Sequence, residues 1–307
     1  MSTDAFLTAL YVMVDDFCNA NLPPDIKTGP AALLSRSEVV TLAIFGQWSL
    51  FDSERGFYRY AERNLRRAFP SLPHRSQFNR LQRRYRDATV AFCLYLVECL
   101  NAKQCPYEIL DAFGVCTRNI KRRGRGWLTG QADAGWCGRL GGFLGFYLLD
   151  AVNPEGVITG YAFGGASAKE QPMADIFLAL RKQPDPSIPS VGTPAWGCYI
   201  ADNGFEGRQR HDYWLTYCGA EVISPRKADC KDAWSGRLWR WLGSIRQIIE
   251  SVHEKLLNTF RLCRERPHDL TGFQARLAAK VALHNFCIWT NRQLGRPNLA
   301  FADLIAW

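Results

Sequence analysis

The stretch YEILDAFGV, residues 107–115, carries the pattern that decides the fold. It is apolar and rich in aromatic and branched residues, so it predicts a β-strand. Asp111 stands inside this run, where a charged side chain is unfavourable unless a partner neutralises it. The stretch therefore predicts a strand that carries a site. The alternative is an edge strand on which Asp111 faces outward.

Outward from this strand, the chain alternates between strands and helices toward its C-terminus. The runs LGFYLLDAV (144–152) and GVITGYAFGGA (156–166) predict an antiparallel hairpin, because the NPEG between them favours a turn. Further strands are predicted at 196–205 and 220–227, and helices at 168–182, 207–218, 234–262 and 272–294. This order predicts an α/β fold in which helices flank both faces of a mixed sheet.

The residues before this region show helical periodicity instead. Helices are predicted at 4–20, at 52–68, from Ser35 or Ser37 onward, and from Ser76, as the cap, to Leu100. We therefore predict two domains: an all-helical N-terminal domain over 1–104, and the α/β domain with its C-terminal helix over 105–307.

The composition limits the class of protein. Of the 307 residues 47% are hydrophobic, which indicates a folded globular chain, and no apolar run is long enough for a transmembrane helix. The 38 Lys and Arg residues exceed the 29 acidic residues, and the net charge of +9 favours a polyanionic partner such as nucleic acid. The N-terminus has no basic signal region and the eleven cysteines form no C-x-x-C pair, so we expect reduced thiols in a cytoplasm.

Two further acids occupy positions that ligand-binding residues favour. Asp202 ends the predicted strand WGCYIAD just before Asn-Gly, and ligands of α/β sheets bind at the carboxyl ends of strands. Glu250 lies near the border of the apolar side of its predicted helix, one turn after Arg246. Each acid also has an ordinary explanation, because turn aspartates are common and Glu250 could simply pair with Arg246.

Taken in order, ILDAFGV, IADNGFEG and Arg246-x-x-x-Glu250 resemble the motifs of the DDE transposases of bacterial insertion sequences. The resemblance spans residues 105–262 and implies a ribonuclease H-like catalytic domain, with Asp111, Asp202 and Glu250 as catalytic residues and metal ligands. It implies two Mg²⁺ ions, with Mn²⁺ as a substitute, hydrolysis that exposes a 3′-hydroxyl at an element end, and strand transfer into target DNA. The helical N-terminal domain would then bind the DNA ends.

The chain departs from one large branch of that family, which has Tyr and Lys where Gly243 and Leu257 stand here. The details of end processing in that branch are therefore not carried over. Glu254 is the rival for the third ligand, and Asp150 and Asp133 are weaker rivals.

Several basic positions are candidates for DNA contacts. They comprise a loop with Lys121, Arg122, Arg123 and Arg125, a helix with Arg80, Arg83 and Arg84, and the single positions Arg208 and Arg246. The loop follows the first strand and suits phosphate contacts, whereas short polar residues at the start of the helix suit a recognition helix. Both groups could instead form solvated surface. Trp234, Trp239 and Trp241 could stack on a base, although a packed core is the commoner use of such residues.

The resulting prediction is a metal-dependent transposase that acts on double-stranded DNA, without a membrane or a small-molecule cofactor. We expect a homodimer on DNA, because two element ends must be paired, in the cytoplasm and associated with the nucleoid. Two alternatives stay open: a DNA-binding protein derived from a transposase without catalysis, and a ribonuclease H-like nuclease that cuts without joining.

Overall fold

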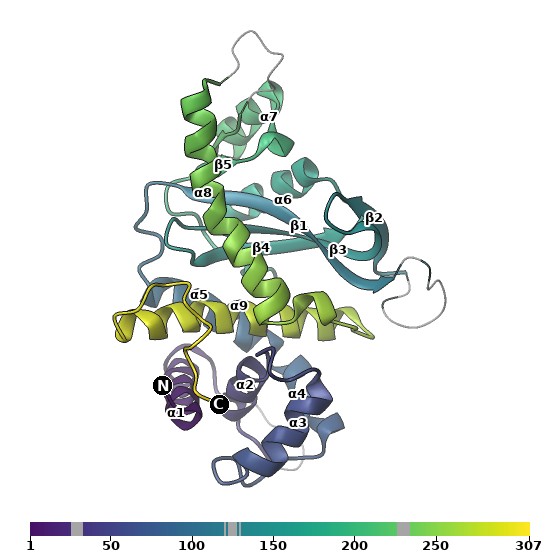
Figure 1. Cartoon of the computed structure of the whole chain (residues 1–307), viewed down its shortest axis with the longest axis vertical. Coiled ribbons are helices and arrows are strands. Elements are labelled where there is room, and N and C mark those ends of the chain that lie inside the picture. The colour runs from purple at the N-terminus through teal and green to yellow at the C-terminus, as the bar shows by residue number, and fades with distance from the viewer. Residues whose placement is uncertain (26–32, 120, 122–127, 129, 226–233) are drawn as a thin grey trace.

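A mixed β-sheet lies at the centre of the structure, a computed structural model that describes residues 1–25, 33–119, 121, 128, 130–225 and 234–307 (Figure 1). Among these residues the sheet has six strands: β1 (Glu108–Asn119), β2 (Asp133–Cys137), β3 (Gly141–Val152), β4 (Ile158–Gly165), β5 (Cys198–Ala201) and β6 (Glu221–Ile223). β1 pairs antiparallel with β3 and parallel with β5, which pairs parallel with β6. β2 and β4 both lie along the other edge of β3. The predicted mixed sheet is confirmed.

Helices cover both faces of this sheet. α8 (Gly236–Glu254) crosses the face nearest the viewer in Figure 1, while α6 (Glu170–Lys182) lies behind the sheet and α7 (Arg208–Tyr213) lies above it. This arrangement confirms the predicted flanking helices. Within the described ranges, no helix has the length and hydropathy that a membrane crossing requires.

The other helices pack together below the sheet in Figure 1. They are α1 (Thr3–Asn21), α2 (Arg36–Phe45), α3 (Glu54–Tyr60), α4 (Arg75–Arg84), α5 (Arg86–Cys99) and α9 (Leu270–Gln293). Of the two predicted caps for α2, the cap is Ser35, which forms a capping box with Glu38. α9 lies along α5 and contacts α2, and Phe286 of α9 packs edge-on against Phe6 of α1. One buried core runs from these helices to the α8 face of the sheet. The domain division after residue 104 stays a prediction.

Two features of the predicted helix from Ser76 to Leu100 were wrong. It is two helices, because the backbone leaves α-helical geometry at Tyr85, where φ is −96° and ψ is 19°. Tyr85 is buried at this break, and its hydroxyl donates a hydrogen bond to Asp25. The cap of α4 is His74 rather than Ser76, because the His74 ring nitrogen accepts a hydrogen bond from the Ser76 backbone.

The side chains of β1 alternate between two cores, as strand geometry requires. Ile109 and Phe113 belong to the core beneath α8, whereas Leu110 belongs to the core beneath α6. Asp111 shares the α8 side with Ile109 and Phe113, and it is 8% exposed. Since β1 lies between β3 and β5, the alternative of an outward acid on an edge strand is excluded.

Candidate active site

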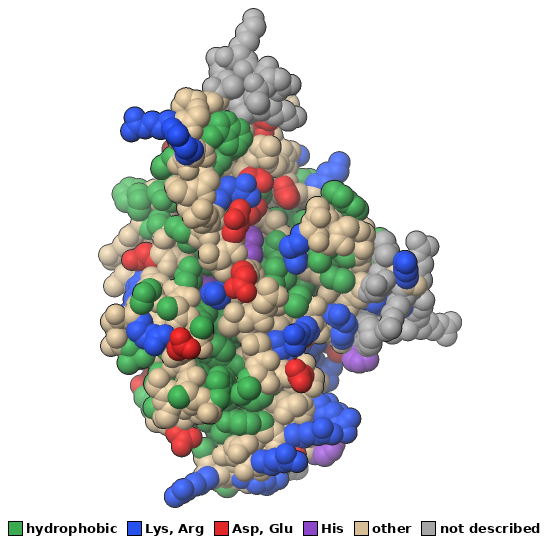
Figure 2. Space-filling view, in the orientation of Figure 1, with side chains coloured by type: hydrophobic (Ala, Val, Ile, Leu, Met, Phe, Trp, Pro, Cys, Tyr) green, Lys and Arg blue, Asp and Glu red, His purple; other side chains and the backbone are tan. Residues whose placement is uncertain are grey.

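The carboxylates of Asp111, Asp202 and Glu250 meet at the guanidinium of Arg246. Its Nη2 atom lies 3.7 Å from Asp111 Oδ2, 3.8 Å from Asp202 Oδ2 and 3.8 Å from Glu250 Oε1. No two of these oxygens can therefore be further apart than about twice that distance. Figure 2 shows acidic side chains gathered where α8 crosses the sheet. Three acids that are far apart in the sequence thus lie within one small site.

The sheet register brings the two aspartates together. β1 and β5 run parallel with Leu110 opposite Ala201, so Asp111 and Asp202 follow these partners at the same level of the sheet. Asp202 stands at the carboxyl end of β5, the position at which α/β sheets bind ligands. Two elements of the sheet therefore fix one half of the site.

The apolar side of α8 brings Glu250 over the sheet. Ile245 and Ile249 are buried in the core shared with β1, so the residues beside them on α8 face the strand ends. Arg246 and Glu250 lie one turn apart at this border, and the Glu250 side chain is 59% exposed. The local pairing of Arg246 with Glu250 is real, but the guanidinium contacts both aspartates as well.

In each aspartate, one carboxylate oxygen accepts a backbone hydrogen bond and the other faces Arg246. Asp111 Oδ1 accepts a hydrogen bond from the backbone nitrogen of Ala112 at 2.9 Å, and Asp202 Oδ1 accepts one from that of Gly204 at 2.7 Å. The Oδ2 atom of each carboxylate faces Arg246. These backbone contacts orient both carboxylates toward a common centre before any ligand arrives.

Burial and the closeness of other acids change the pKa of Asp111. Burial, and then the charge of Asp202, raise the pKa of the Asp111 carboxyl from 3.8 to about 6, against the opposing effects of His253, Arg246 and the Ala112 backbone. A pKa this high means that a cation near the site would be needed to keep Asp111 ionised without penalty. His253 and Arg246 favour the ionised form but do not outweigh the burial of Asp111 and the charge of Asp202.

A fourth carboxylate, Glu170, was missed by the sequence reasoning. It lies in the first turn of α6, and its Oε2 atom sits so close to Gly204 that a Cβ at that position would be 2.1 Å away. Burial raises the pKa of Glu170 to about 7, with further contributions from Asp202 and Asp111. Acids are common in the first turn of any helix, so the sequence carried no specific signal for this residue. A side chain at 204 would push the Glu170 carboxylate away from this position.

Among the described residues, Arg246 forms ion pairs with none of the rival acids. Glu254 is exposed and contacts Lys255 at 3.2 Å and Asn258 at 3.5 Å. Asp133 is exposed on β2, where its Oδ2 accepts a hydrogen bond from Ser167 at 2.9 Å. Asp150 is fully buried, and its Oδ1 lies 2.8 Å from Nε2 of His253 on α8. The geometry therefore favours Glu250 over Glu254 as the third member of the cluster.

Asp150 and His253 form a buried pair behind the cluster. His253 Nε2 lies 2.8 Å from Asp150 Oδ1, and the ring of His253 packs against that of Phe113 with centroids 4.1 Å apart. Asp150 lies directly opposite Asp111 in the pairing of β1 with β3. Burial alone would lower the pKa of His253, but Asp150 and then Asp111 raise it above its ordinary value. The pair ties α8, one turn after Glu250, to the sheet.

The arginines predicted on one helix lie on α4 and differ in their surroundings. Arg80 is exposed, Arg83 pairs with Asp269 at 2.7 Å, and Arg84 pairs with Asp25 at 3.3 Å. Of the polar residues at the start of the helix, Asn79 donates hydrogen bonds of 2.8 and 3.0 Å to Glu54. An Asn79 amide that is engaged within the chain is not free to read a base, so a major-groove recognition helix is not supported by this side chain.

The other predicted contact residues lie outside α4. Arg208 is exposed at the start of α7 and Lys121 is exposed after β1, whereas Arg122, Arg123 and Arg125 fall outside the described residues. Trp239 and Trp241 are 38% and 41% exposed near the start of α8, and the ring of Trp234 is tilted against that of Trp239 with centroids 6.4 Å apart. These two tryptophans are therefore surface residues and not the packed core that such residues commonly form.

Comparisons with known proteins add one solved structure. No protein-family model and no curated protein matches the chain. A crystal structure of a pre-cleavage Mos1 transpososome is similar at 13% identity, covering 89% of this chain and 84% of that chain, with a TM-score of 0.23. A likeness at that score carries no argument about function, so the case below rests on the geometry of the carboxylates.

Proposed function

We propose that this chain is a metal-dependent DNA strand transferase of the DDE transposase type, from a bacterial insertion sequence, with Asp111, Asp202 and Glu250 as its catalytic residues. The observation that carries the proposal is the meeting of these three carboxylates at one atom of Arg246. They come from two neighbouring strand ends and a helix laid across them, and the sheet is compatible with a ribonuclease H-like fold.

The donor set fits a hard divalent cation. Mg²⁺ prefers a few carboxylate oxygens completed by water and phosphate, and Asp111 and Asp202 each present one oxygen whose partner is fixed by the backbone. The burial and the neighbouring acid that raise the pKa of Asp111 support the proposal, because a cation beside these carboxylates would offset both effects. When bound, two Mg²⁺ ions, or Mn²⁺ in their place, would supply charge neutralisation at the phosphate and activation of the attacking oxygen.

The residues of the chain would position the reacting phosphate and contact the DNA strand. Asp111 and Asp202 sit on the rigid sheet and set the position of the reacting phosphate, while Glu250 approaches from α8. Arg246 contacts all three acids in this structure, and a guanidinium in that position would suit a nonbridging phosphate oxygen once cations compensate the carboxylates. Exposed Arg208 and Lys121 would contact the strand on either side.

The partner would be double-stranded DNA, bound by a homodimer that pairs two element ends. The net charge of +9 supports a polyanionic partner. The exposed Trp239 and Trp241 beside Arg237 and Arg240 offer aromatic faces for an unpaired base near the cleavage site.

The experiment is cleavage of supercoiled DNA that carries the ends of the element. We expect nicking with Mg²⁺ or Mn²⁺ and none with EDTA. Asp111→Asn, Asp202→Asn and Glu250→Gln should each lower cleavage by at least about a thousandfold, with binding to the same DNA retained. Glu254→Gln is the matched control, because it neutralises an acid on the same helix outside the cluster. Cleavage lost in Glu254→Gln but kept in Glu250→Gln would overturn the assignment.

The same DNA separates the alternatives. A labelled element end with a free 3′-hydroxyl should become joined to target DNA, because a strand transferase uses that hydroxyl as its nucleophile. Cutting without any joined product would favour the nuclease, and binding without cutting would favour a DNA-binding protein that has lost catalysis.

A further inference from the structure

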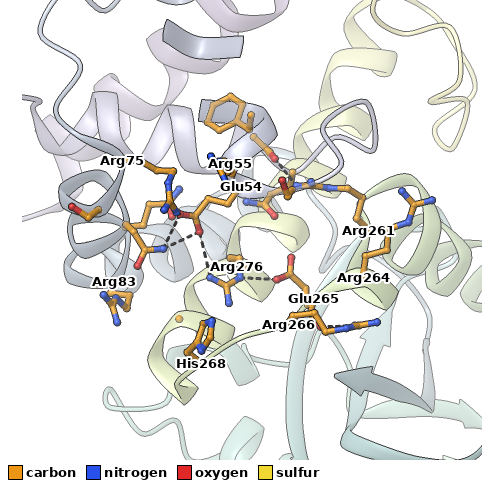
Figure 3. Close-up of a pocket in the computed structure, with 18 of the residues that line it drawn as sticks. Glu54, Arg55, Arg75, Arg83, Arg261, Arg264, Glu265, Arg266, His268 and Arg276 are labelled. Carbon is orange, nitrogen blue, oxygen red and sulfur yellow. Dashed lines mark hydrogen bonds and ion pairs between the residues drawn. The ribbon is translucent and has the colours of Figure 1, made fainter. Parts of the chain in front are cut away.

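A basic cleft of about 550 Å³ lies between α3, α4 and the segment that leads into α9 (Figure 3). Of the described residues that line it, eight are arginines and four are acidic. The arginines come from segments about two hundred residues apart in the sequence, as Arg55 on α3 and Arg266 before α9 show. The site proposed above makes no use of this cleft.

The acids in the cleft are already neutralised by partners within the chain. Glu265 pairs with Arg276 at 2.7 Å and with buried Lys280 at 2.8 Å. Burial opposes its ionisation, yet Lys280 and Arg276 hold the pKa of Glu265 at about 2. Glu54 accepts two hydrogen bonds from Asn79 and lies 3.7 Å from Arg276. Figure 3 shows this network at the floor of the cleft.

Three guanidinium groups of the cleft have no carboxylate partner among the described residues. Arg55 and Arg80 are exposed, and within the part of the chain that the structure describes they form no ion pair or hydrogen bond. Arg266 donates only to backbone carbonyls, those of Cys116, Cys263 and Glu265. Guanidinium groups without carboxylate partners, on three sides of one hollow, suit an anion that carries several separated charges.

The cleft lies within reach of DNA held at the carboxylates. Arg266 contacts the carbonyl of Cys116 on β1, five residues along the strand from Asp111. Five residues of extended strand span roughly 17 Å, which is about half of a helical turn of B-DNA. In Figure 2 basic side chains gather below the end of α8, on the face that also carries the acidic cluster. One duplex could therefore touch both places.

From this geometry we infer that the cleft binds the sugar-phosphate backbone of duplex DNA next to the bond that is cut, with Arg55, Arg80 and Arg266 as its phosphate contacts. With a volume of about 550 Å³, the cleft is too small for a whole duplex, whose backbones are separated by grooves about 12 Å and about 6 Å wide. It therefore receives one strand's phosphates and positions the DNA without reading its sequence. The inference rests on the proposed function only in taking DNA as the polyanion.

The test measures binding of a short duplex DNA of arbitrary sequence in EDTA, by fluorescence anisotropy at several salt concentrations. Arg55→Ala/Arg80→Ala removes two proposed phosphate contacts. The control is Arg66→Ala/Arg67→Ala, which removes the same charge from two exposed arginines outside the cleft. Because each lost contact lowers the slope of log K against log salt by roughly 0.9, the cleft variant should lose about 1.8 in slope and the control close to none. Thermal unfolding checks that both variants are folded.

The outcomes separate the cleft from the active site. Equal loss of slope in the two variants would show that binding follows net charge, and an unchanged slope in the cleft variant would show that the cleft does not contact DNA; either result overturns the inference. The proposed function fails separately if wild-type protein binds the duplex with this dependence on the cleft but never cleaves element-end DNA with Mg²⁺.

Discussion

At the scale of single residues, Asp111 sets the electrostatics of the cluster. It is 8% exposed, and burial with the neighbouring Asp202 raises its pKa to about 6. A raised pKa of this kind means that folding favours the neutral acid. The contribution to stability is complete at low pH, and it is lost as the pH rises from about 4 through about 6.

Asp111→Asn removes this dependence and keeps the shape of the side chain. In metal-free buffer the variant should gain about 3 kcal/mol in free energy of unfolding, relative to wild-type protein, between about pH 4 and pH 7. Urea unfolding of both proteins across that range measures the difference. A difference that does not change with pH would show that Asp111 is ionised in the fold at no penalty.

Glu170 adds negative charge beside Asp202, so it should strengthen cation binding without being part of the triad. Two unit charges about 4 Å apart interact by roughly 1 kcal/mol in water and roughly 4 kcal/mol near a protein surface. We expect Glu170→Gln to weaken Mn²⁺ binding by about tenfold, measured by calorimetry. Glu254→Gln, which removes the same charge farther along α8, serves as the comparison. Identical affinities in the two variants would place Glu170 outside the site.

At the scale of elements, the pair of His253 and Asp150 holds α8 on the sheet. Both side chains are buried, and Asp150 Oδ2 has no hydrogen-bond partner among the described residues. Removing one partner of a buried pair leaves the other charge uncompensated, which typically costs about 3–5 kcal/mol. His253→Leu should therefore destabilise the protein by about that amount in chemical unfolding.

The double variant His253→Leu/Asp150→Leu tests the origin of this loss. Without either charge, it should be more stable than His253→Leu alone, because two apolar groups of similar size can replace a buried pair. If the double variant were the less stable of the two, the role of His253 would be packing against Phe113 and not compensation of Asp150.

Elements with strong local patterns were predictable from the sequence, and those set by distant partners were not. β1, β3 and β4 follow from apolar runs and a turn sequence, whereas β2 is short and contains glycine and charge, so its place depends on pairing with β3. The break at Tyr85 interrupts an otherwise helical pattern, because burial of that side chain overrides periodicity. Glu170 joins the cluster only through tertiary contacts. Asp111 was predictable because an acid in an apolar strand requires a partner.

At the scale of the whole molecule, one buried core joins the N-terminal helices, α9 and the α8 face of the sheet. Neither part can expose its side of this core without losing much of its apolar burial. We therefore expect one cooperative thermal transition, with calorimetric and van't Hoff enthalpies in agreement. Two resolved transitions would instead mean that the helical part and the sheet fold as separate units, as the predicted division after residue 104 would allow.

The acidic cluster and the basic side chains below the end of α8 lie on the same face of the molecule (Figure 2). In a metal-free state Arg246 lies at 3.7–3.8 Å from each of the three acids, and His253 adds a weaker balancing effect at Asp111. The proposed function requires that divalent cations take over this role. That requirement concerns the intact chain and can be tested without DNA.

Binding of Mn²⁺ to the intact protein, followed through loss of the free-ion signal in electron paramagnetic resonance, tests this requirement at neutral pH. Wild-type protein and Glu254→Gln should bind Mn²⁺ alike, while Asp111→Asn and Asp202→Asn should bind it at least about tenfold more weakly, since each removes a carboxylate that faces the centre of the cluster. Equal binding by wild-type protein and Asp111→Asn would contradict a metal site at these carboxylates, and with it the proposed chemistry.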